Sequence, residues 1–369
     1  MFIKKLVVLI CGLMFISACS HLESDGRVER SFSPIWSKNL DPRYDSGNLP
    51  IALQSPLIFE GLVFVGDNAG SFTAFELENG RLVWKEQENT TYHAGAVGYK
   101  DQIIYGTVQG LVTSRQYLTG KIKYSVDLGA SIETSGTIYQ GRIFFQLRNH
   151  QVFALDLETG KILWAYKRSV PNLTTLQRAA RPIVYKDKVI VGFADGSLTA
   201  LSLDEGVLLY ETKLANAAKF LDVDMTAFVF NDFIYAGAMG SSMNVLDPKN
   251  GKVLRKGDFS SSAGPVVIEN QLVFGTPNGE LIVTDKNLNI ERREKVTANF
   301  ISSIVTYNKL LAIGSTDGAV RLVDPKTLKN VDQFTFGHAY SAIFGDLTSL
   351  DNYLAVLSSR NRLFVFKKN

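Results

Sequence analysis

Short apolar segments separated by turn residues recur along this chain with the spacing expected of β-strands. The clearest unit has an apolar strand at 61–66, a polar turn at 67–70 and a strand at 71–77. After the Gly80 turn, a last strand ends in Trp84. Apolar runs of this length, bounded by Gly, Asn and Asp, are typical of strands, and no segment has a sustained helical period.

The residue that closes the second strand of this unit recurs eight times, at intervals of 38 to 46 residues. Its positions are Gly66, Gly106, Gln146, Gly192, Gly237, Gly275, Gly314 and Leu357. The period is that of propeller blades, about 40–45 residues. We therefore predict an all-β, eight-bladed β-propeller with four antiparallel strands per blade. A pair of β-sandwiches also has regular short strands, but it does not explain the fixed period. Because Gln146 and Leu357 replace glycine, we expect those two turns to differ in shape.

The two ends of the chain predict how the ring closes. The eighth unit stops after three strands, the last at 362–366, whereas an unassigned strand with Trp36 lies at 33–37. If the N-terminal strand completes the last blade, the chain ends leave no open sheet edge between them. Aromatic residues end other fourth strands, as Trp164 does, and a large ring there can fill the gap between blades. Arg255 takes this place in the fifth unit.

Two neighbouring links between blades are longer than the others and predict a binding face. From Trp164 to Pro182 is 18 residues, and from Tyr210 to Ala227 is 17. With four strands per blade, links between blades open on the same face as the turns between second and third strands. Long loops on a rigid scaffold are where binding residues concentrate. Apolar and charged residues in these links are typical of a protein-binding patch, although the same residues could cap the propeller instead.

The N-terminus predicts export and lipidation. Lys4 and Lys5 precede an apolar run at 6–16, which is too short to span a bilayer and is typical of a signal peptide. The following Ile-Ser-Ala-Cys resembles a bacterial lipobox, which implies cleavage before Cys19 and acylation of its sulfur. We expect a signal peptide at 1–18, a lipid-anchored tether at 19–31, and a propeller at 32–369. Ser20, where inner-membrane lipoproteins often have Asp, favours the periplasmic face of the outer membrane.

Composition and motifs give no sign of catalysis. The net charge is +3 for the whole chain, without a basic face or polybasic run, which argues against nucleic acid as a partner. None of the four histidines has metal-ligand spacing, and no phosphate loop or nucleophile elbow is present. Asp-Gly pairs such as Asp195-Gly196 fit hairpin turns better than calcium loops. We therefore predict a protein with no catalytic residue, metal site or cofactor.

The chain as a whole resembles the BamB family, lipoproteins of the outer-membrane β-barrel assembly (BAM) machine. The lipobox, the eight repeats, the Trp36 strand and both long links carry the resemblance. It implies a non-catalytic scaffold that binds the periplasmic (POTRA) domains of BamA and aids insertion of outer-membrane β-barrels, with unfolded outer-membrane proteins as further candidate partners. It assigns BamA binding to two groups of residues, Leu173, Leu176 and Arg178 in the first link and Asp222 and Asp224 in the second. Gln177, between Leu176 and Arg178, departs from the family spacing.

Two other functions stay open from the sequence. The repeat at 154–164 also resembles that of quinoprotein dehydrogenases, which hold pyrroloquinoline quinone and calcium in a propeller. Several of those enzymes use an adjacent-cysteine disulfide, which the mature chain cannot form. A cell-wall glycan-binding propeller is the other alternative, with Tyr92 and Tyr340 as exposed aromatics that could stack on sugars.

Overall fold

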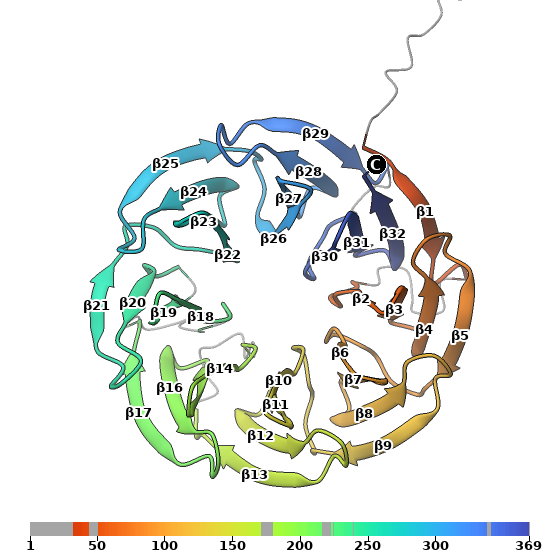
Figure 1. Ribbon diagram of the computed structural model, residues 1–369, viewed down its shortest axis with the longest axis horizontal. Coiled ribbons are helices and arrows are strands. Elements are labelled where there is room, and N and C mark those ends of the chain that lie inside the picture. The colour runs from red at the N-terminus through yellow and green to blue at the C-terminus, as the bar shows by residue number, and fades with distance from the viewer. Residues whose placement is uncertain are drawn as a thin grey trace, which may run out of the picture. The chain divides into compact units, whose positions relative to one another are not determined.

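The compact unit that begins at Pro34 is a ring of β-sheets. The computed structural model describes residues 32–43, 51–170, 180–215, 223, 225–238, 240–337 and 341–368. These residues form 32 strands in eight four-stranded antiparallel sheets. The sheets stand as blades around a common centre, with one strand of each blade innermost and one at the perimeter (Figure 1). The predicted all-β, eight-bladed propeller is confirmed.

The first, innermost strand has three residues in six of the eight blades, and six and seven residues in blades six and seven. The first, innermost strands are β2 Leu57–Phe59, β6 Val97–Tyr99, β10 Thr137–Tyr139, β14 Ile183–Tyr185, β18 Phe228–Phe230, β22 Ala263–Ile268, β26 Ile301–Tyr307 and β30 Thr348–Leu350. The second strands are β3 Leu62–Gly66, β7 Gln102–Gly106, β11 Arg142–Gln146, β15 Lys188–Gly192, β19 Phe233–Ala236, β23 Gln271–Gly275, β27 Leu310–Ser315 and β31 Tyr353–Ser358.

The outer two strands complete each blade. The third strands are β4 Ser71–Glu76, β8 Leu111–Gln116, β12 Gln151–Asp156, β16 Ser197–Ser202, β20 Asn244–Leu246, β24 Glu280–Thr284, β28 Ala319–Val323 and β32 Arg362–Lys367. The fourth, outermost strands are β5 Leu82–Gln87, β9 Ile122–Asp127, β13 Ile162–Lys167, β17 Leu208–Lys213, β21 Val253–Lys256, β25 Ile290–Lys295, β29 Asn330–Thr335 and β1 Pro34–Asn39.

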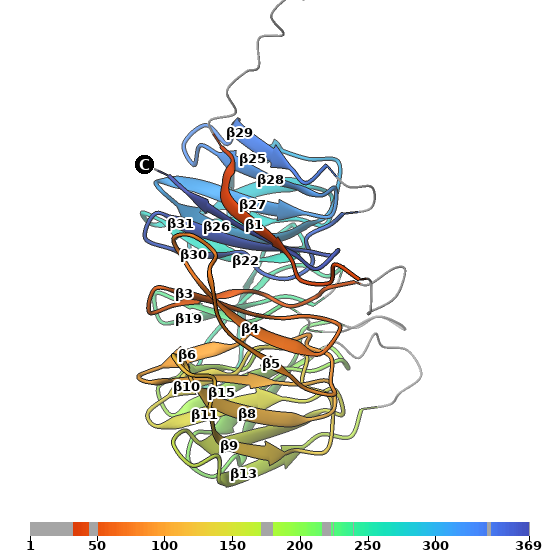
Figure 2. The ribbon, with the colours of Figure 1, turned by 90° about the vertical axis from the view of Figure 1, so that its right-hand side faces the viewer.

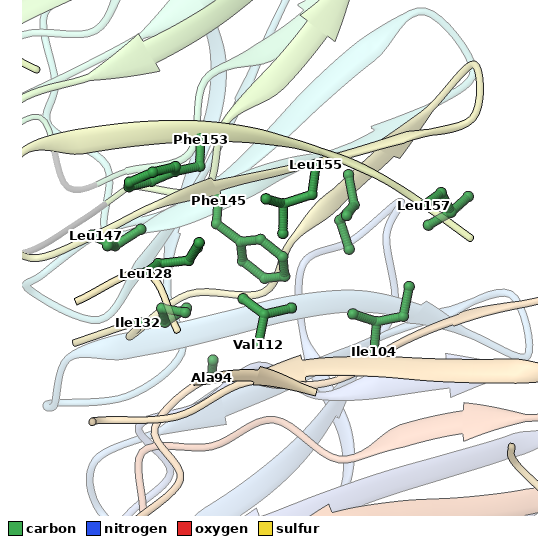
Figure 3. Close-up of a cluster of buried hydrophobic side chains, with 11 residues drawn as sticks. Ala94, Ile104, Val112, Leu128, Ile132, Phe145, Leu147, Phe153, Leu155 and Leu157 are labelled. Carbon is green, nitrogen blue, oxygen red and sulfur yellow. The ribbon is translucent and has the colours of Figure 1, made fainter. Parts of the chain in front are cut away.

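The hydrophobic core lies between blades and is repeated around the ring. In Figure 3, Phe145 of blade three lies beside Val112 and Ile104 of blade two, and all three are almost fully buried. Each second and third strand packs against a neighbouring blade on both faces. This explains why their apolar runs are nearly continuous rather than alternating. Such burial supplies most of the stabilisation of the ring.

The ring closes through the N-terminal strand, as predicted. β1 pairs antiparallel with β32, so the eighth blade contains the first and the last strand of the described chain. β1 runs along the outside of this blade (Figure 2). The Trp36 indole donates a hydrogen bond to the Leu77 carbonyl of blade one, with 2.8 Å between Nε1 and O. The last blade is thereby fixed to the first.

A fourth-strand aromatic ring packs on a glycine of the next blade at five junctions. Glycine is required there because the ring occupies the place of a side chain; a Cβ on Gly80 would lie 2.7 Å from the Trp36 ring. The ring's polar atom also donates to the carbonyl three residues before the glycine. The pairs are Trp36 with Gly80, Trp84 with Gly120, Tyr124 with Gly160, Trp164 with Gly206, and Tyr210 with Gly251.

Two junctions replace both members of this pair. Arg255 and Arg292 take the places of the ring, and Leu288 and Leu328 take the places of the glycine, with φ of 65° and 58°. The leucine side chains are buried, so they replace the apolar contact that the aromatic ring makes at the other junctions. At the second junction Arg292 donates to the Pro325 carbonyl, three residues before Leu328. The loss of glycine and the loss of the ring are therefore coupled.

The turn after Gln146 does not differ in shape from its equivalents, so that prediction was wrong. Leu147 N donates to Gln151 O at 2.9 Å, as Thr107 N does to Leu111 O after Gly106. His150 supplies the positive φ, 64°, that glycine supplies elsewhere. What changes is the residue that packs on this position. A tyrosine, isoleucine, valine or methionine side chain packs on each second-strand glycine, whereas the small residue Ala180 lies beside Gln146.

Leu357 follows the same rule as Gln146. After Leu357, Asn361 N donates to Ser358 O and adopts a φ of 52° in place of glycine, so this turn also keeps the usual shape. Buried Ala52 lies in the same core cluster as Leu357. The missing glycines are therefore compensated by small link residues rather than by altered turns.

Candidate partner-binding face

The links between blades and the turns between second and third strands share one face, as expected. At the end of the fourth strand in blades two to four, a backbone N–H donates to the carbonyl at the end of that turn. The bonds are Leu128 N to Gly110 O, Arg168 N to His150 O, and Leu214 N to Gly196 O, at 2.8 to 3.2 Å. The two long links therefore start on the same face, from neighbouring blades three and four.

The residues that the resemblance assigned to partner binding lie outside the described residues. This applies to Leu173, Leu176 and Arg178 in the first link, to Asp222 and Asp224 in the second, and to Cys19. Their assignments stay predictions. The structure does describe the residues at which both links leave and rejoin the propeller, and these define the geometry of the face.

The first link starts at an ion network between blades three and four. Arg168, just after β13, donates from Nε and Nη2 to Asp195 Oδ2 at 2.9 and 2.6 Å. It also forms a bidentate pair with Glu211 on β17, at 2.6 and 2.9 Å. Its guanidinium carbon lies 5.4 Å from the centre of the Phe193 ring. Planar bidentate recognition of this kind is specific to arginine.

The electrostatics of this network favour its charged form. The hydrogen bond from Arg168 is the main cause that lowers the pKa of Glu211. Burial raises the pKa of Asp195, but hydrogen bonds from Ser197 and Arg168 outweigh it and hold that pKa below its usual value. The Arg168 pKa is raised, first by Glu211. The network is therefore ionised at neutral pH.

The second link is anchored to the same turn of blade four. Lys213, at the end of β17, donates from Nζ to the Asp195 carbonyl. Val223 is fully buried, and its N–H donates to Phe193 O at 3.1 Å. A Cβ on Gly192 would lie 2.5 Å from Val223, so the valine packs directly on this glycine. The turn at 193–196 thus anchors the starts of both links. It also anchors Val223, the residue between Asp222 and Asp224.

Gln146 anchors the return of the first link. Its side chain accepts a hydrogen bond from Ala180 N at 2.9 Å and donates to Gly192 O of blade four, also at 2.9 Å. Both bonds are buried, and buried amide groups rarely lack partners. The first link is therefore tied at both ends to blade four. In the sequence, Gln146 is recognisable only as a replacement of the repeated glycine.

Arg181, which follows Ala180 in the chain, carries the opposite charge to Asp346. Both side chains are exposed. Protein around each one lowers the Arg181 pKa and raises the Asp346 pKa, and their mutual attraction opposes both changes. Asp346 N also donates to Ser55 Oγ at 2.7 Å.

The aromatic residue proposed for glycan stacking is not available. Tyr92 is fully buried, packed on Gly66 and against the rings of Phe72 and Tyr105. The prediction that it is exposed was wrong, because a ring in the link fills the space over the missing Cβ of the second-strand glycine. Tyr340 lies outside the described residues.

The described residues contain neither a metal-binding cluster nor a membrane-spanning helix. Among the described residues, no group of three or more His, Cys, Asp or Glu side chains could hold a metal ion. His93 lies 3.9 Å from Glu133, which also pairs with Arg148. No helix in the described ranges is long and apolar enough to cross a membrane.

The fold and its repeats define a propeller of the quinoprotein type. The chain resembles the quinohemoprotein alcohol dehydrogenase of Comamonas testosteroni with a TM-score of 0.72 and 10% identity, over 92% of this chain and 76% of that one. It resembles the crystal structure of BamB from Moraxella catarrhalis with a TM-score of 0.77 and 17% identity, over 91% and 100%. At these identities both structures establish the fold alone.

Sequence comparison distinguishes between these two classes. The family model described as "Outer membrane protein assembly factor BamB" matches residues 74–288, which is more than half of the chain. The outer membrane protein assembly factors BamB of Yersinia pestis and Escherichia coli K12 are 21% and 20% identical to it, each covering 87% of this chain and 88% of the relative. The chain belongs to the BamB family of outer-membrane protein assembly factors. That family is non-catalytic, in contrast to the dehydrogenases that share its fold.

Proposed function

We propose that this protein is a lipid-anchored scaffold of outer-membrane protein assembly that docks on the periplasmic POTRA domains of BamA through its two long links. Family membership supports a role in assembly. The observation that carries the docking proposal is the shared turn at 193–196. It fixes the starts of both links, and it holds Val223 between the two acidic residues assigned to binding.

The proposed contact joins Leu173, Leu176 and Arg178 on one link with Asp222 and Asp224 on the other. Apolar anchors beside charged groups are the composition of a protein-binding patch. Because the starts of both links are held by the same turn of blade four, the partner meets them in a fixed relative position. Holding a site in place before binding reduces the entropy lost on association.

The docking proposal is tested by reversing charge in the second link. We expect the Asp222→Lys, Asp224→Lys double variant to lose co-purification with BamA while its circular dichroism and melting temperature stay unchanged. The matched control is Asp204→Lys with Glu205→Lys, an acidic pair between β16 and β17 on the opposite face of blade four. Unchanged recovery of BamA with the first variant, or equal loss with the control, would contradict the site.

The anchor is tested separately. In a Cys19→Ala variant the sulfur that takes the diacylglycerol is absent, so we expect loss of radiolabelled palmitate incorporation and a shift from the outer-membrane fraction to the soluble periplasmic fraction. Retention in the outer membrane without palmitate would show that protein contacts alone hold the chain there.

A further inference from the structure

The junction between blades five and six has a cavity where five other junctions hold an aromatic ring. Its volume is about 190 Å³, and it is lined by Phe233, Val245, Leu254, Arg255, Lys286 and Asn287. Arg255 takes the place of the ring and pairs with Val245 in the strand register. Trp36, the ring at the equivalent position of blade eight, pairs likewise with a valine, so this strand partner leaves room for an indole. Buried Leu288 therefore replaces the ring only in part.

The arginine at this junction does not bridge the two blades. Among the described residues, the hydrogen bond of the Arg255 guanidinium goes to the Leu254 carbonyl of its own strand, at 3.3 Å. Arg292, at the equivalent position of the next blade, instead donates to the Pro325 and Lys326 carbonyls across its junction. The junction between blades six and seven is thus closed by an arginine, whereas the junction between blades five and six keeps its cavity.

Two cations lie at this cavity. Arg255 and Lys286 both line it and are exposed, and neither forms an ion pair with another residue in the described part of the chain. Asp285, the acid in the same turn as Lys286, is occupied by the turn itself. Its carboxylate accepts hydrogen bonds from Asn287 N and Asn289 N at 2.8 and 2.9 Å. The cavity therefore combines apolar walls with two positive charges that lack a counterion.

We infer that this cavity binds a small aromatic carboxylate, a molecule with one ring and a carboxylate a few bonds away. The ring takes the place beside Val245 that an aromatic side chain has at other junctions, and the carboxylate pairs with Arg255 and Lys286. A guanidinium binds a carboxylate through two parallel hydrogen bonds. An apolar cavity of about 150 Å³ is enough to hold benzene, so one ring fits.

The surroundings of the cavity define the ligand further. The Lys286 carbonyl already accepts a hydrogen bond from the buried Tyr235 hydroxyl at 2.6 Å. The ring therefore needs no donor of its own, and a phenyl group is sufficient. The turn between β24 and β25 opens on the face opposite the two long links. The site is thus separate from the proposed docking to BamA and does not depend on it.

The probe is 3-(4-fluorophenyl)propionate, mixed with the purified full-length protein in detergent and followed by the width of its fluorine NMR line, with detergent alone as the blank. We expect saturable broadening, and affinity weakened at least tenfold in the double variant Arg255→Gln, Lys286→Gln. The matched control is Lys256→Gln, an exposed lysine next to Arg255 on β21 that does not line the cavity. The uncharged propanamide should bind at least tenfold more weakly than the propionate.

A variant that fills the cavity from within tests the position of the ring. Arg255→Trp with Leu288→Gly places an indole where the probe ring lies, so it should abolish binding. A ligand that binds only the folded state raises the melting temperature. The probe should therefore raise the melting temperature of the natural protein and of Lys256→Gln, but not that of the filled variant.

Four results would overturn the inference. Three are the absence of saturable broadening, equal binding of the propanamide, and an equal loss with Lys256→Gln. The fourth is unchanged binding by the filled variant, since the probe would then occupy another part of the protein. Circular dichroism confirms that each variant is folded. If the filled variant does not fold, the variant without the two exposed cations still decides the outcome.

Discussion

The Trp36 ring lies on Gly80, in the place that a side chain at residue 80 would occupy. One residue belongs to the strand that closes the last blade, and the other to a turn of the first blade. The same pairing of ring and glycine recurs at four more junctions, so it fixes the angle between neighbouring blades around much of the ring.

Gly80→Ala and Gly61→Ala separate ring contact from backbone strain. The two glycines have nearly equal φ, 70° and 72°, but a Cβ on Gly61 meets nothing within 4 Å. Gly61→Ala should cost about 1–2 kcal/mol in the free energy of unfolding, from left-handed strain alone. Gly80→Ala should cost about 1–3 kcal/mol more, because the methyl group displaces the Trp36 ring. Equal losses in urea titrations would show that the ring does not depend on the glycine.

The junction between blades five and six can be converted to the common type. Its cavity of about 190 Å³ is lined by Arg255 and Asn287, next to buried Leu288, where other junctions hold a ring. Arg255→Trp alone should destabilise the fold because the indole meets Leu288. Leu288→Gly alone should cost about 2–4 kcal/mol through lost burial.

The double variant at this junction provides the decisive comparison. Together, Arg255→Trp and Leu288→Gly recreate the pair of ring and glycine, so their combined effect should be smaller than the sum of the single effects by at least about 1 kcal/mol. Thermal unfolding of the four proteins measures this coupling. Strict additivity would mean that the two replacements arose independently of each other.

Arg168 should contribute more to stability than a surface arginine. Arg168→Met leaves Asp195 and Glu211 without their partner, and both arginine and Asp195 side chains are about 15% exposed. We expect a loss of about 2–3 kcal/mol in the free energy of unfolding, from charge-assisted hydrogen bonds. Arg148→Met, whose arginine is 51% exposed, should cost less than about 1 kcal/mol. Comparable losses in the two variants would contradict a special role for Arg168.

Asp317 should make the stability of blade seven depend on acid pH. Burial raises its pKa, but hydrogen bonds from Arg321, Ser315 and Thr297 outweigh this and lower the pKa to about 2 from 3.8. A lowered folded-state pKa gives stability that is complete above the unfolded pKa and is lost as the pH falls from about 4 to about 2. The loss amounts to about 2 kcal/mol.

Substitution identifies this contribution. Asp317→Asn should lower stability at pH 6 and flatten its fall between pH 4 and pH 2. Glu294→Gln, at an exposed position of β25, should leave the profile unchanged. If Asp317→Asn falls with pH as steeply as the natural protein, another carboxylate is responsible.

Local pattern was sufficient to predict the fold. The repeat length of the blades follows from strand length and turn chemistry. Both can be recognised in short stretches of consecutive residues, such as those around Gly66 and Gly80. Closure by Trp36 could also be predicted, since an unpaired strand at one end matched a missing strand at the other. The sequence could not reveal compensation between distant positions, so it predicts an altered turn after Gln146, whose side chain instead accepts a hydrogen bond from Ala180 N.

For the candidate site, the sequence predicted only the face of the propeller on which it lies, and not the contacts that hold the two long links. The spacing of Trp164 and Pro182 located the first long link, but the network that fixes it joins Arg168 to partners 27 and 43 residues away. No single residue in that set has an unusual local context, and the Asp195-Gly196 pair by itself predicts only a turn. Tyr92 was misplaced for a similar reason, because its burial depends on the glycine at position 66.

The position of β1 in the eighth blade has a consequence for folding. β1 is the first strand of the described chain, and β32, its partner, is the last. Each of blades one to seven can form from one continuous stretch of chain, but the eighth needs strands from both ends of the described residues. Closure of the ring therefore depends on the pairing of the two strands that are farthest apart in the sequence, and until that happens β1 has no partner strand.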